Sequence, residues 1–372
     1  ALEVEVVREI HAFAALRAEW CELLQHSNAD CIFLSWEWMH TWWKHLAAGR
    51  ELHLITVRRG GHLMGIAPLA VRPRQPQRLF PFHALEFIAT GSVGSDYLDL
   101  IIRRGEEVPV TQAFAAELAD SDLMLDLSQV KLSSTHAGRL AASLLDRGWT
   151  ASQMVTDICP YVSLAGHDWD SYLGSLGRAH RYNVRRRLRN LDNSFALTWE
   201  QATTEESRQK CYRALVDLHM LRWAARQGSD ALHSRALVEF HDEWTRLALD
   251  RGWLRLCLLS LDREPAAAVY GFRYGDIFHF YQSGFDPAYS SHSVGLAALA
   301  MSIRDAIAEG AQEYDLLHGS ESYKFLWTSQ GRDLSRLELF PPNSSGLVYR
   351  QALRLRNGMK AIMRWSPPTH AG

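Results

Sequence analysis

The sequence contains one strand–turn–strand pattern twice, once in each half. Apolar runs at residues 52–57 and 63–71 flank a short turn, and runs at 254–261 and 266–274 do the same. Each pair follows a predicted helix and precedes another strand and a turn-rich segment. Because the order of elements around the two hairpins matches, we interpret the chain as a duplication. The repeat predicts a mixed α/β protein of two similar domains, each with a central twisted sheet flanked by helices.

Composition supports two globular domains. A chain of 372 residues, 47% of them apolar, is long enough for two domains with substantial cores. We place the first domain at residues 1–156 and the second at 161–340, with a basic helix and tail at 347–372. The 40 basic and 42 acidic residues give a net charge of −2, which argues against general nucleic-acid binding but leaves room for a local basic patch.

The sequence points to a cytoplasmic protein. No apolar run approaches the roughly 18–20 residues that cross a bilayer, and the start has no signal-peptide pattern. The five cysteines form no CxxC pair, so we expect reduced, mostly buried thiols.

The segment 276–319 favours a phosphate site in the second domain. Residues 276–282 alternate and are rich in aromatics, 283–295 form a turn-rich loop, and apolar residues then recur at helical spacing as far as Gly310. A strand that feeds a small-residue loop and a helix directs several backbone N–H groups and the positive end of the helix dipole at one place. That place suits a pyrophosphate; the alternative is a βαβ crossover that binds nothing.

Two other segments have a clear helical pattern. Residues 35–46 place Trp38, Trp42 and Leu46 on one face with Ser35 as N-cap, which predicts a packed inner face. Residues 177–191 hold six arginines and no acid, with Arg178 and Arg189 at the two ends of one stripe. Like charges at such spacing cost stability, so an anionic ligand would offset them, since arginine binds phosphate and carboxylate bidentately. The alternative is a solvated basic face paired with acids elsewhere.

Several common catalytic motifs are missing. The chain has no GxSxG, HExxH, P-loop or GxGxxG motif, and its 17 histidines show no metal-ligand spacing. We expect no metal and no permanently bound cofactor. A transfer enzyme that works by positioning and proton handling, or a binding protein, remains.

Seven stretches in order carry a family resemblance: residues 33–43, 95–100, 181–187, 219–223, 270–287, 295–310 and 314–327. Together they resemble the bacterial GNAT-type acyltransferases often called CelD/BcsL-like, found with cellulose and exopolysaccharide genes. That family is in turn similar to the Fem-type aminoacyltransferases of peptidoglycan synthesis. The resemblance implies two tandem GNAT-like domains, with the active cleft between them or within the second.

The resemblance also implies a donor site. In the GNAT fold an acyl-CoA thioester lies between two splayed central strands, with its pyrophosphate on the amides before the next helix. Here that position falls on Ser291, His292, Ser293, Val294 and Gly295, with acyl-CoA as co-substrate. The usual GNAT loop contains a Gln or Arg followed by two spaced glycines. This segment departs from that pattern, since Gly295 is its only glycine. Fem-type relatives use aminoacyl-tRNA instead, and their first domain has lost the donor site.

Acyl transfer needs a base for the acceptor and a group that stabilises the oxyanion. Lys324 matches the Fem-type lysine near the reacting carbonyl, which predicts that it holds the oxyanion. Asp96 matches the acidic position on the first-domain side of the cleft and is expected to orient or deprotonate the acceptor. Asp315, His318 and Glu321 are the alternative bases.

The predicted substrate-binding residues are Arg181, Arg185, Arg222, Arg226 and Tyr281. Arg222 and Arg226 lie one helical turn apart, where they would grip an acceptor phosphate or carboxylate.

We therefore expect an N- or O-acyltransferase that moves an acyl group from acyl-CoA to an amine or hydroxyl of a small-molecule or glycan-precursor acceptor. One alternative is an aminoacyl-tRNA-dependent, Fem-like transferase that binds tRNA through the basic helix 178–189. The other is a non-catalytic GNAT scaffold in polysaccharide synthesis, which a Lys324 buried in an ion pair would favour.

Overall fold

The computed structural model of the chain describes residues 1–72, 83–131, 133, 136–224, 234–344, 346–348 and 350–351. Arg226 and most of the expected C-terminal helix and tail lie outside these residues.

The strands are β1 (Leu2–Val7), β2 (Glu51–Arg59), β3 (His62–Arg72), β4 (Ala84–Phe87), β5 (Ile101–Ile102), β6 (Met124–Lys131), β7 (Thr150–Ser163), β8 (Leu197–Gln201), β9 (Leu254–Leu261), β10 (Glu264–Tyr274), β11 (Ile277–Phe285), β12 (Glu313–Asp315) and β13 (Gly331–Phe340). The α-helices are α1 (Ile10–Ala15), α2 (Arg17–Gln25), α3 (Trp36–Leu46), α4 (Glu107–Ala119), α5 (His136–Leu145), α6 (Trp169–Ser175), α7 (Arg178–Ser194), α8 (Glu205–Ala224), α9 (Arg235–Asp250) and α10 (Val294–Ala308). Short 3₁₀ turns are η1 (Ile32–Leu34), η2 (Pro287–His292) and η3 (Lys324–Leu326).

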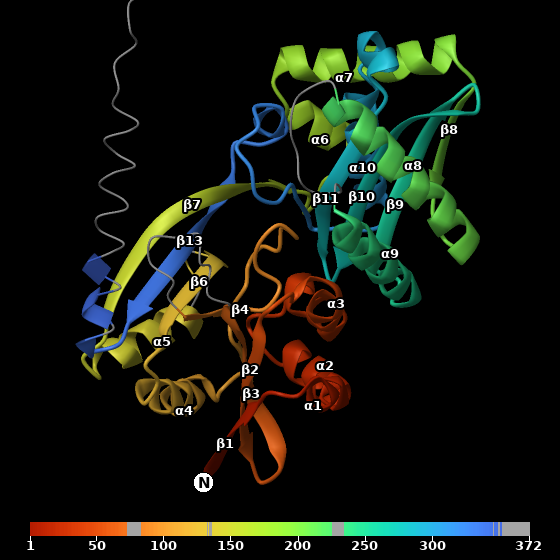
Figure 1. The fold of residues 1–372 in the computed structure, drawn as a ribbon. Coiled ribbons are helices and arrows are strands. Elements are labelled where there is room, and N and C mark those ends of the chain that lie inside the picture. The colour runs from red at the N-terminus through yellow and green to blue at the C-terminus, as the bar shows by residue number, and fades with distance from the viewer. Residues whose placement is uncertain are drawn as a thin grey trace, which may run out of the picture.

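One mixed sheet runs through both halves of the molecule (Figure 1). Among the described residues its strand order is β1-β2-β3-β4-β6-β13-β7-β12-β11-β10-β9-β8, with β5 beside β3. In the first half an edge strand, the β2–β3 hairpin and β4 are antiparallel neighbours, and β4 then pairs in parallel with β6. In the second half β8, the β9–β10 hairpin, β11 and its parallel partner β12 repeat this order. The two hairpins therefore occupy equivalent places, which confirms the predicted duplicated α/β architecture.

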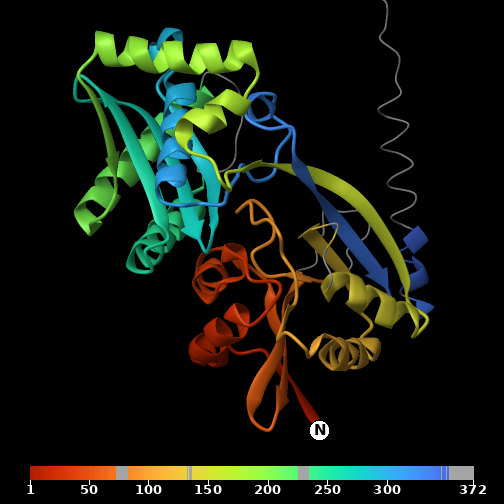
Figure 2. The same ribbon diagram turned by 180° about the vertical axis from the view of Figure 1, so that it is seen from behind.

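The long strand β7 joins the two halves, and both views show it curving between them (Figure 2). Most of β7 pairs with β13, and its last residues, 161–163, pair with β12. β13 comes from the end of the second predicted domain, but it lies between β6 and β7. The limits 1–156 and 161–340 remain a prediction, and in space the second segment returns a strand to the sheet of the first half.

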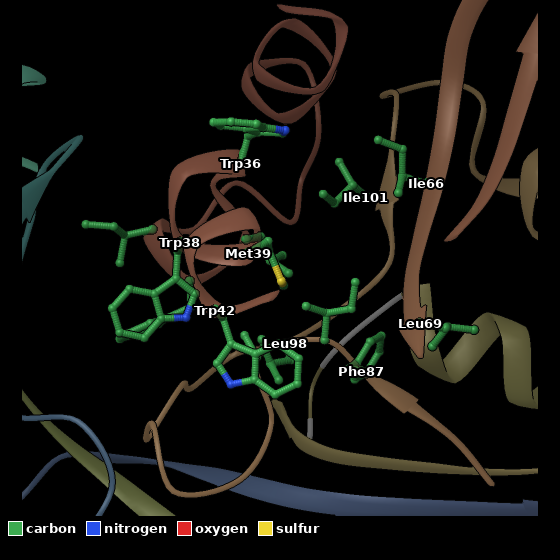
Figure 3. Packing of buried hydrophobic residues seen from close by; sticks show 14 of the residues in the cluster. Trp36, Trp38, Met39, Trp42, Ile66, Leu69, Phe87, Leu98 and Ile101 are labelled. Atoms are coloured by element: carbon green, nitrogen blue, oxygen red, sulfur yellow. The ribbon is translucent and has the colours of Figure 1, made fainter. Parts of the chain in front are cut away.

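The tryptophan helix α3 packs into the core as predicted. Ser35 caps it by accepting a hydrogen bond from the Trp38 N–H at 3.3 Å. Trp38 and Trp42 are buried, and Figure 3 shows them beside Leu98 of the first half. The Trp38 ring also packs edge-on against Trp244 of α9, with 4.9 Å between the ring centroids. One hydrophobic cluster therefore extends through both halves, so that apolar packing as well as β7 holds them together.

The two faces of the second half's sheet carry different helices. Side chains at alternate positions of β10 point to opposite faces, so Ala268 and Tyr270 pack with α8 and α9. Ala267 and Val269 pack with α6, α7 and α10 in a second cluster. The candidate donor site lies on this second face.

Candidate active site

A pocket of about 470 Å³ opens beside the start of α10. β11 and β12 pair at residues 277–279 and 313–315 only, and then diverge. The pocket lies beyond that divergence, between β11, the first turn of α10 and residues 322–327. Among the described residues that line it, all are serines, glycine or apolar and aromatic residues, and none is charged. The splayed parallel strands thus form a neutral, largely apolar slot.

The first turn of α10 faces this pocket and is suited to bind an anion. Its N-cap, Ser293, has left-handed backbone angles (φ 57°, ψ 43°), and its side chain makes no capping hydrogen bond. The first N–H groups of a helix have no partner within the helix, and they carry the positive end of the dipole. A Cβ on Gly295 would lie 3.3 Å from the Phe285 ring, so a larger side chain would crowd the slot.

Three of the five predicted donor residues line the pocket: Ser293, Val294 and Gly295. The other two lie in η2, on the side of α7. The Ser291 carbonyl accepts a hydrogen bond from Arg187 at 2.8 Å. The His292 ring packs edge-on against the Phe195 ring, with 5.0 Å between the ring centroids. Nothing in the sequence pattern singled out Arg187 from its neighbouring arginines.

A carboxylate from the first half and an imidazole from the second form the central polar pair. Asp96 is fully buried. It accepts hydrogen bonds from the His318 backbone N–H at 2.9 Å and from the ring Nδ1 at 2.8 Å. Because Nδ1–H is held by the carboxylate, the lone pair of Nε2 is left to accept a proton. The His318 side chain is 37% exposed, so His318 is the member of the pair that a substrate can reach.

The electrostatics of the pair favour a protonated His318. Burial lowers the pKa of His318, but the hydrogen bond and charge of Asp96 outweigh this and leave the pKa above its ordinary value. A base held by a buried carboxylate is the arrangement that general-base catalysis uses to orient an imidazole and stabilise its charged form.

The loop that carries Asp96 fills the first half's counterpart of the donor slot. β4 and β6 pair in parallel at residues 84–85 and 124–125 and then diverge. The Thr90 hydroxyl lies 2.8 Å from that of Ser128, and the Leu98 N–H donates to the Gln129 carbonyl of β6 at 3.0 Å. The gap that is open in the second half is therefore closed in the first.

Buried side chains fix this loop. Trp38 Nε1 donates to the Ser95 hydroxyl at 2.8 Å. The Tyr281 hydroxyl donates to the Val93 carbonyl, and Tyr281 is the extra residue of a bulge where the register of β11 shifts against β10. Tyr281, predicted to bind substrate, thus positions the segment that presents Asp96.

Lys324 supports the loop that carries His318. Its side chain is buried, and Nζ donates to the carbonyls of Leu317 at 3.2 Å and His318 at 2.6 Å. It also pairs with the half-exposed Glu321 at 3.0 Å. An ammonium has three N–H donors, and all three have acceptors here. The oxyanion role of Lys324 and the base role of Glu321 stay predictions.

Asp315 lies at the end of β12, three residues before His318. It accepts hydrogen bonds from the Tyr97 hydroxyl at 2.6 Å and the Leu317 N–H at 2.8 Å, and Arg332 lies 3.4 Å away. Burial raises the pKa of Asp315 to about 7. Asp315 lines a separate cavity of about 620 Å³ between the halves, which shares no lining residue with the donor slot.

Two of the predicted arginines, Arg181 and Arg185, contact groups other than this pair. Arg181 donates to the Gly174 carbonyl at 2.8 Å, and Arg185 lies 3.3 Å from Asp170, so both belong to the outer surface around α6 and α7. Arg222 falls within α8. Their binding roles remain predictions.

In the described part of the chain, no three His, Cys, Asp or Glu side chains are grouped so as to hold a metal ion. None of the helices there is long and apolar enough to span a bilayer. All five cysteines are free.

The second half of the chain is similar to GNAT-type domains. Residues 178–325 match the family described as an acetyltransferase (GNAT) domain. This range begins at α7 and ends at Phe325, so it holds His318, Lys324 and the lining of the donor slot except Leu326 and Trp327. None of the curated proteins compared with the chain matches it.

Solved structures share the fold of both halves. The crystal structure of FemX superposes with a TM-score of 0.60 at 12% identity, covering 94% of this chain and 99% of FemX. A protein of unknown function from Bacteroides thetaiotaomicron gives 0.58 at 12% identity, covering 91% and 99%. The C-terminal domain of a putative lysylphosphatidylglycerol synthetase from Agrobacterium fabrum gives 0.55 at 9% identity, covering 93% and 96%. At such identities the likeness shows the fold alone, and the narrower CelD/BcsL-like resemblance stays a prediction.

Proposed function

We propose that the protein is an acyltransferase that moves an acyl group from acyl-CoA to an amine or hydroxyl of a small-molecule or glycan-precursor acceptor. The observation that carries this proposal is the Asp96–His318 pair. The pair joins the two halves, and its His318 lies in the loop that leads into residues 322–327, which form one wall of the donor slot.

The donor would lie in the slot with its pyrophosphate on the first turn of α10. Because β12 leaves β11 after Asp315, the main chain of β11 beyond His279 borders the gap in which the thioester carbonyl would sit. Main-chain N–H groups at such a place can stabilise an oxyanion.

His318 would act as the general base. Its Nε2 takes the proton from the acceptor amine or hydroxyl as the new C–N or C–O bond forms, and Asp96 stabilises the resulting imidazolium. The tetrahedral intermediate then expels the thiolate, the C–S bond breaks, and the proton passes from His318 to the leaving sulfur. Asp96 has no exposed surface, so it orients His318 and does not itself meet the acceptor.

Two alternatives have supporting observations of their own. The exposed arginines of α7 and the FemX-like fold favour an aminoacyl-tRNA donor. The ion pair between the buried Lys324 and the half-exposed Glu321 favours a non-catalytic scaffold. The open donor slot and the oriented His318 favour the acyl-CoA enzyme over both.

Calorimetry with CoA, followed by a thiol-release assay with acetyl-CoA and a panel of amines and amino sugars, tests the proposal. We expect CoA to bind, adenosine 3′,5′-bisphosphate to compete, and thiol release to depend on the acceptor. His318→Gln should keep CoA affinity and lower kcat by about 10²–10⁴-fold. His167→Gln, a histidine of the same half whose side chain contacts Ser171 and Tyr172, is the control.

Each contrary outcome has a distinct meaning. A folded wild type that does not bind CoA would overturn the acyl-CoA donor and favour the tRNA. CoA binding without turnover of any acceptor would favour the scaffold. Normal turnover in His318→Gln would remove the Asp96–His318 pair from the reaction.

A further inference from the structure

The outer face of α7 carries more positive charge than the acidic residues in contact with it neutralise. Arg178, Arg185, Arg186 and Arg189 are exposed. Among the described residues, the acid paired with this face is Asp170, which lies 3.3 Å from Arg185 and is itself 84% exposed. An ion pair so open to solvent contributes little. The remaining like charges at helical spacing repel one another, so a bound anionic partner would stabilise this surface.

The inner face of α7 contacts both rims of the donor slot. The His180 ring packs edge-on against Trp327, which lines the slot, at 4.7 Å. Arg187 donates to the Ser291 carbonyl, two residues before the N-cap of α10. Figure 1 shows α7 lying across the end of the second half, above α10. The charged outer surface is therefore a neighbour of the donor entrance.

The outer arginines are not placed to hold a CoA molecule in the slot. At 3.6 residues per turn, Arg178, Arg185 and Arg189 lie on the opposite side of the helix from Arg187. A donor phosphate on α10 would meet the inner side of α7 only. The outer charge therefore needs a second explanation.

Exposed apolar and aromatic side chains accompany this charge. Tyr182 is 66% exposed on the outer face, and Phe325 and Leu326 are 41% and 51% exposed at the slot, which Leu326 also lines. Arginine with exposed aromatic residues is the composition enriched at protein–protein interfaces.

We propose that the outer face of α7 docks an acidic carrier protein that presents the acyl group on a phosphopantetheine arm. The inference rests on the proposed function, because the arm would enter the same slot as acyl-CoA. The slot has a neutral lining, which fits an uncharged amide chain, and its one phosphate would lie at the start of α10. The transfer step is unchanged: the C–S bond to the carrier's arm breaks and the arm leaves as a thiol.

The neutral lining of the slot argues against an aminoacyl-tRNA as the donor that docks on the outer face of α7. An aminoacyl group brings an ammonium, and a buried cation needs an acid beside it. No carboxylate is found among the described residues that line the slot.

The test compares two donors and two charge-reversed proteins. Arg178→Glu with Arg189→Glu changes the outer face of α7, and Arg139→Glu with Arg147→Glu makes the same change of charge at exposed positions of the first half. The donors are acetyl-CoA and a purified bacterial acyl carrier protein loaded with acetyl-phosphopantetheine. Binding of that carrier is measured by fluorescence anisotropy, apart from turnover, and circular dichroism checks the fold.

We expect the α7 variant to lower carrier binding and kcat/KM for the carrier by about tenfold or more, with a steep salt dependence in the wild type. Its kcat/KM for acetyl-CoA should stay within about twofold, and the control should match wild type with both donors. Equal use of the carrier by both variants would overturn the docking surface, as would acetyl-CoA turnover without carrier binding. Binding of tRNA that the α7 variant alone weakens, with no carrier binding, would assign the face to RNA. Carrier binding at α7 without turnover of either donor would keep the docking surface and refute the proposed function.

Discussion

Replacing Asp96 by asparagine tests which member of the central pair accepts the proton. The buried carboxylate accepts hydrogen bonds from the backbone N–H and Nδ1 of His318 at 2.9 and 2.8 Å and from Gln129 at 3.3 Å. Asparagine keeps the shape, but its NH₂ must face one of these donors. One buried donor then loses its acceptor, at a cost of about 1–3 kcal/mol. The substitution also removes the charge that raises the pKa of His318.

With His318 as base, kcat should fall by about 10²–10⁴-fold, because the imidazole loses its orientation and its charged form loses a partner. The pH dependence has a definite sign. In the wild type the rate rises as His318 loses its proton, so the rising limb of the pH–rate profile has its midpoint above the ordinary histidine pKa of about 6.5. In Asp96→Asn that pKa falls and the limb moves to lower pH. The relative loss of activity should therefore be smallest at low pH.

The measurement is kcat for thiol release from acetyl-CoA between about pH 5 and 9. Asp126→Asn is the matched control: Asp126 is also buried, and it is held by Arg72 and Arg336 at 2.6 Å each. It should lose stability and leave the limb in place. If the rising limb of Asp96→Asn stays where it lies in the wild type, that limb does not report a His318 held by Asp96, and our assignment is refuted.

Three further substitutions test the surroundings of the pair. Gly295→Val should weaken CoA binding about tenfold or more in calorimetry, because a Cβ there already lies 3.3 Å from Phe285; unchanged affinity would move the pyrophosphate elsewhere. Lys324→Met should lower the free energy of unfolding in urea by about 2–4 kcal/mol, since two buried carbonyls lose their donor. A variant of normal stability whose kcat falls about 10²–10³-fold would instead support the oxyanion role. Since burial raises the Asp315 pKa to about 7, the folded state keeps a proton that the unfolded state releases near pH 4, and stability falls as pH rises from about 4 to 7. In Asp315→Asn, the free energy of unfolding from urea titrations should therefore differ less between about pH 5 and about pH 8 than in the wild type. An equal difference in both proteins would contradict this reading.

Local patterns in the sequence predicted the elements well. The alternation of residues 276–282 and the helical spacing that follows gave β11 and α10, and the two hairpins gave the equivalent strand pairs. Ser35 and the tryptophans of α3 have the predicted cap and burial. These features depend on periodicity and turn chemistry, and both are determined by residues close together in the sequence.

The arrangement of the site depends on long-range pairing that no such pattern carries. Asp96 and His318 were separate candidates for the base, and only the meeting of the two halves shows that one holds the other. The family resemblance pointed to Lys324 as the residue that holds the oxyanion. It did not show that the lysine's ammonium has three acceptors within the folded loop. The return of β13 to the first half likewise follows from a register between distant strands.

The two halves use one architectural feature in opposite ways. Where two parallel strands diverge, the second half leaves a slot bounded by a helix start, and the first half fills the gap with the loop that bears Asp96. A filled gap cannot take a donor, but it can carry a carboxylate into the other half, where His318 needs one. Residues 1–156 alone would also lack β13, the strand that lies between β6 and β7. Because neither half holds both the slot and the complete pair, the two halves together form one candidate active site rather than two, and the packing between α3 and α9 helps to set its geometry.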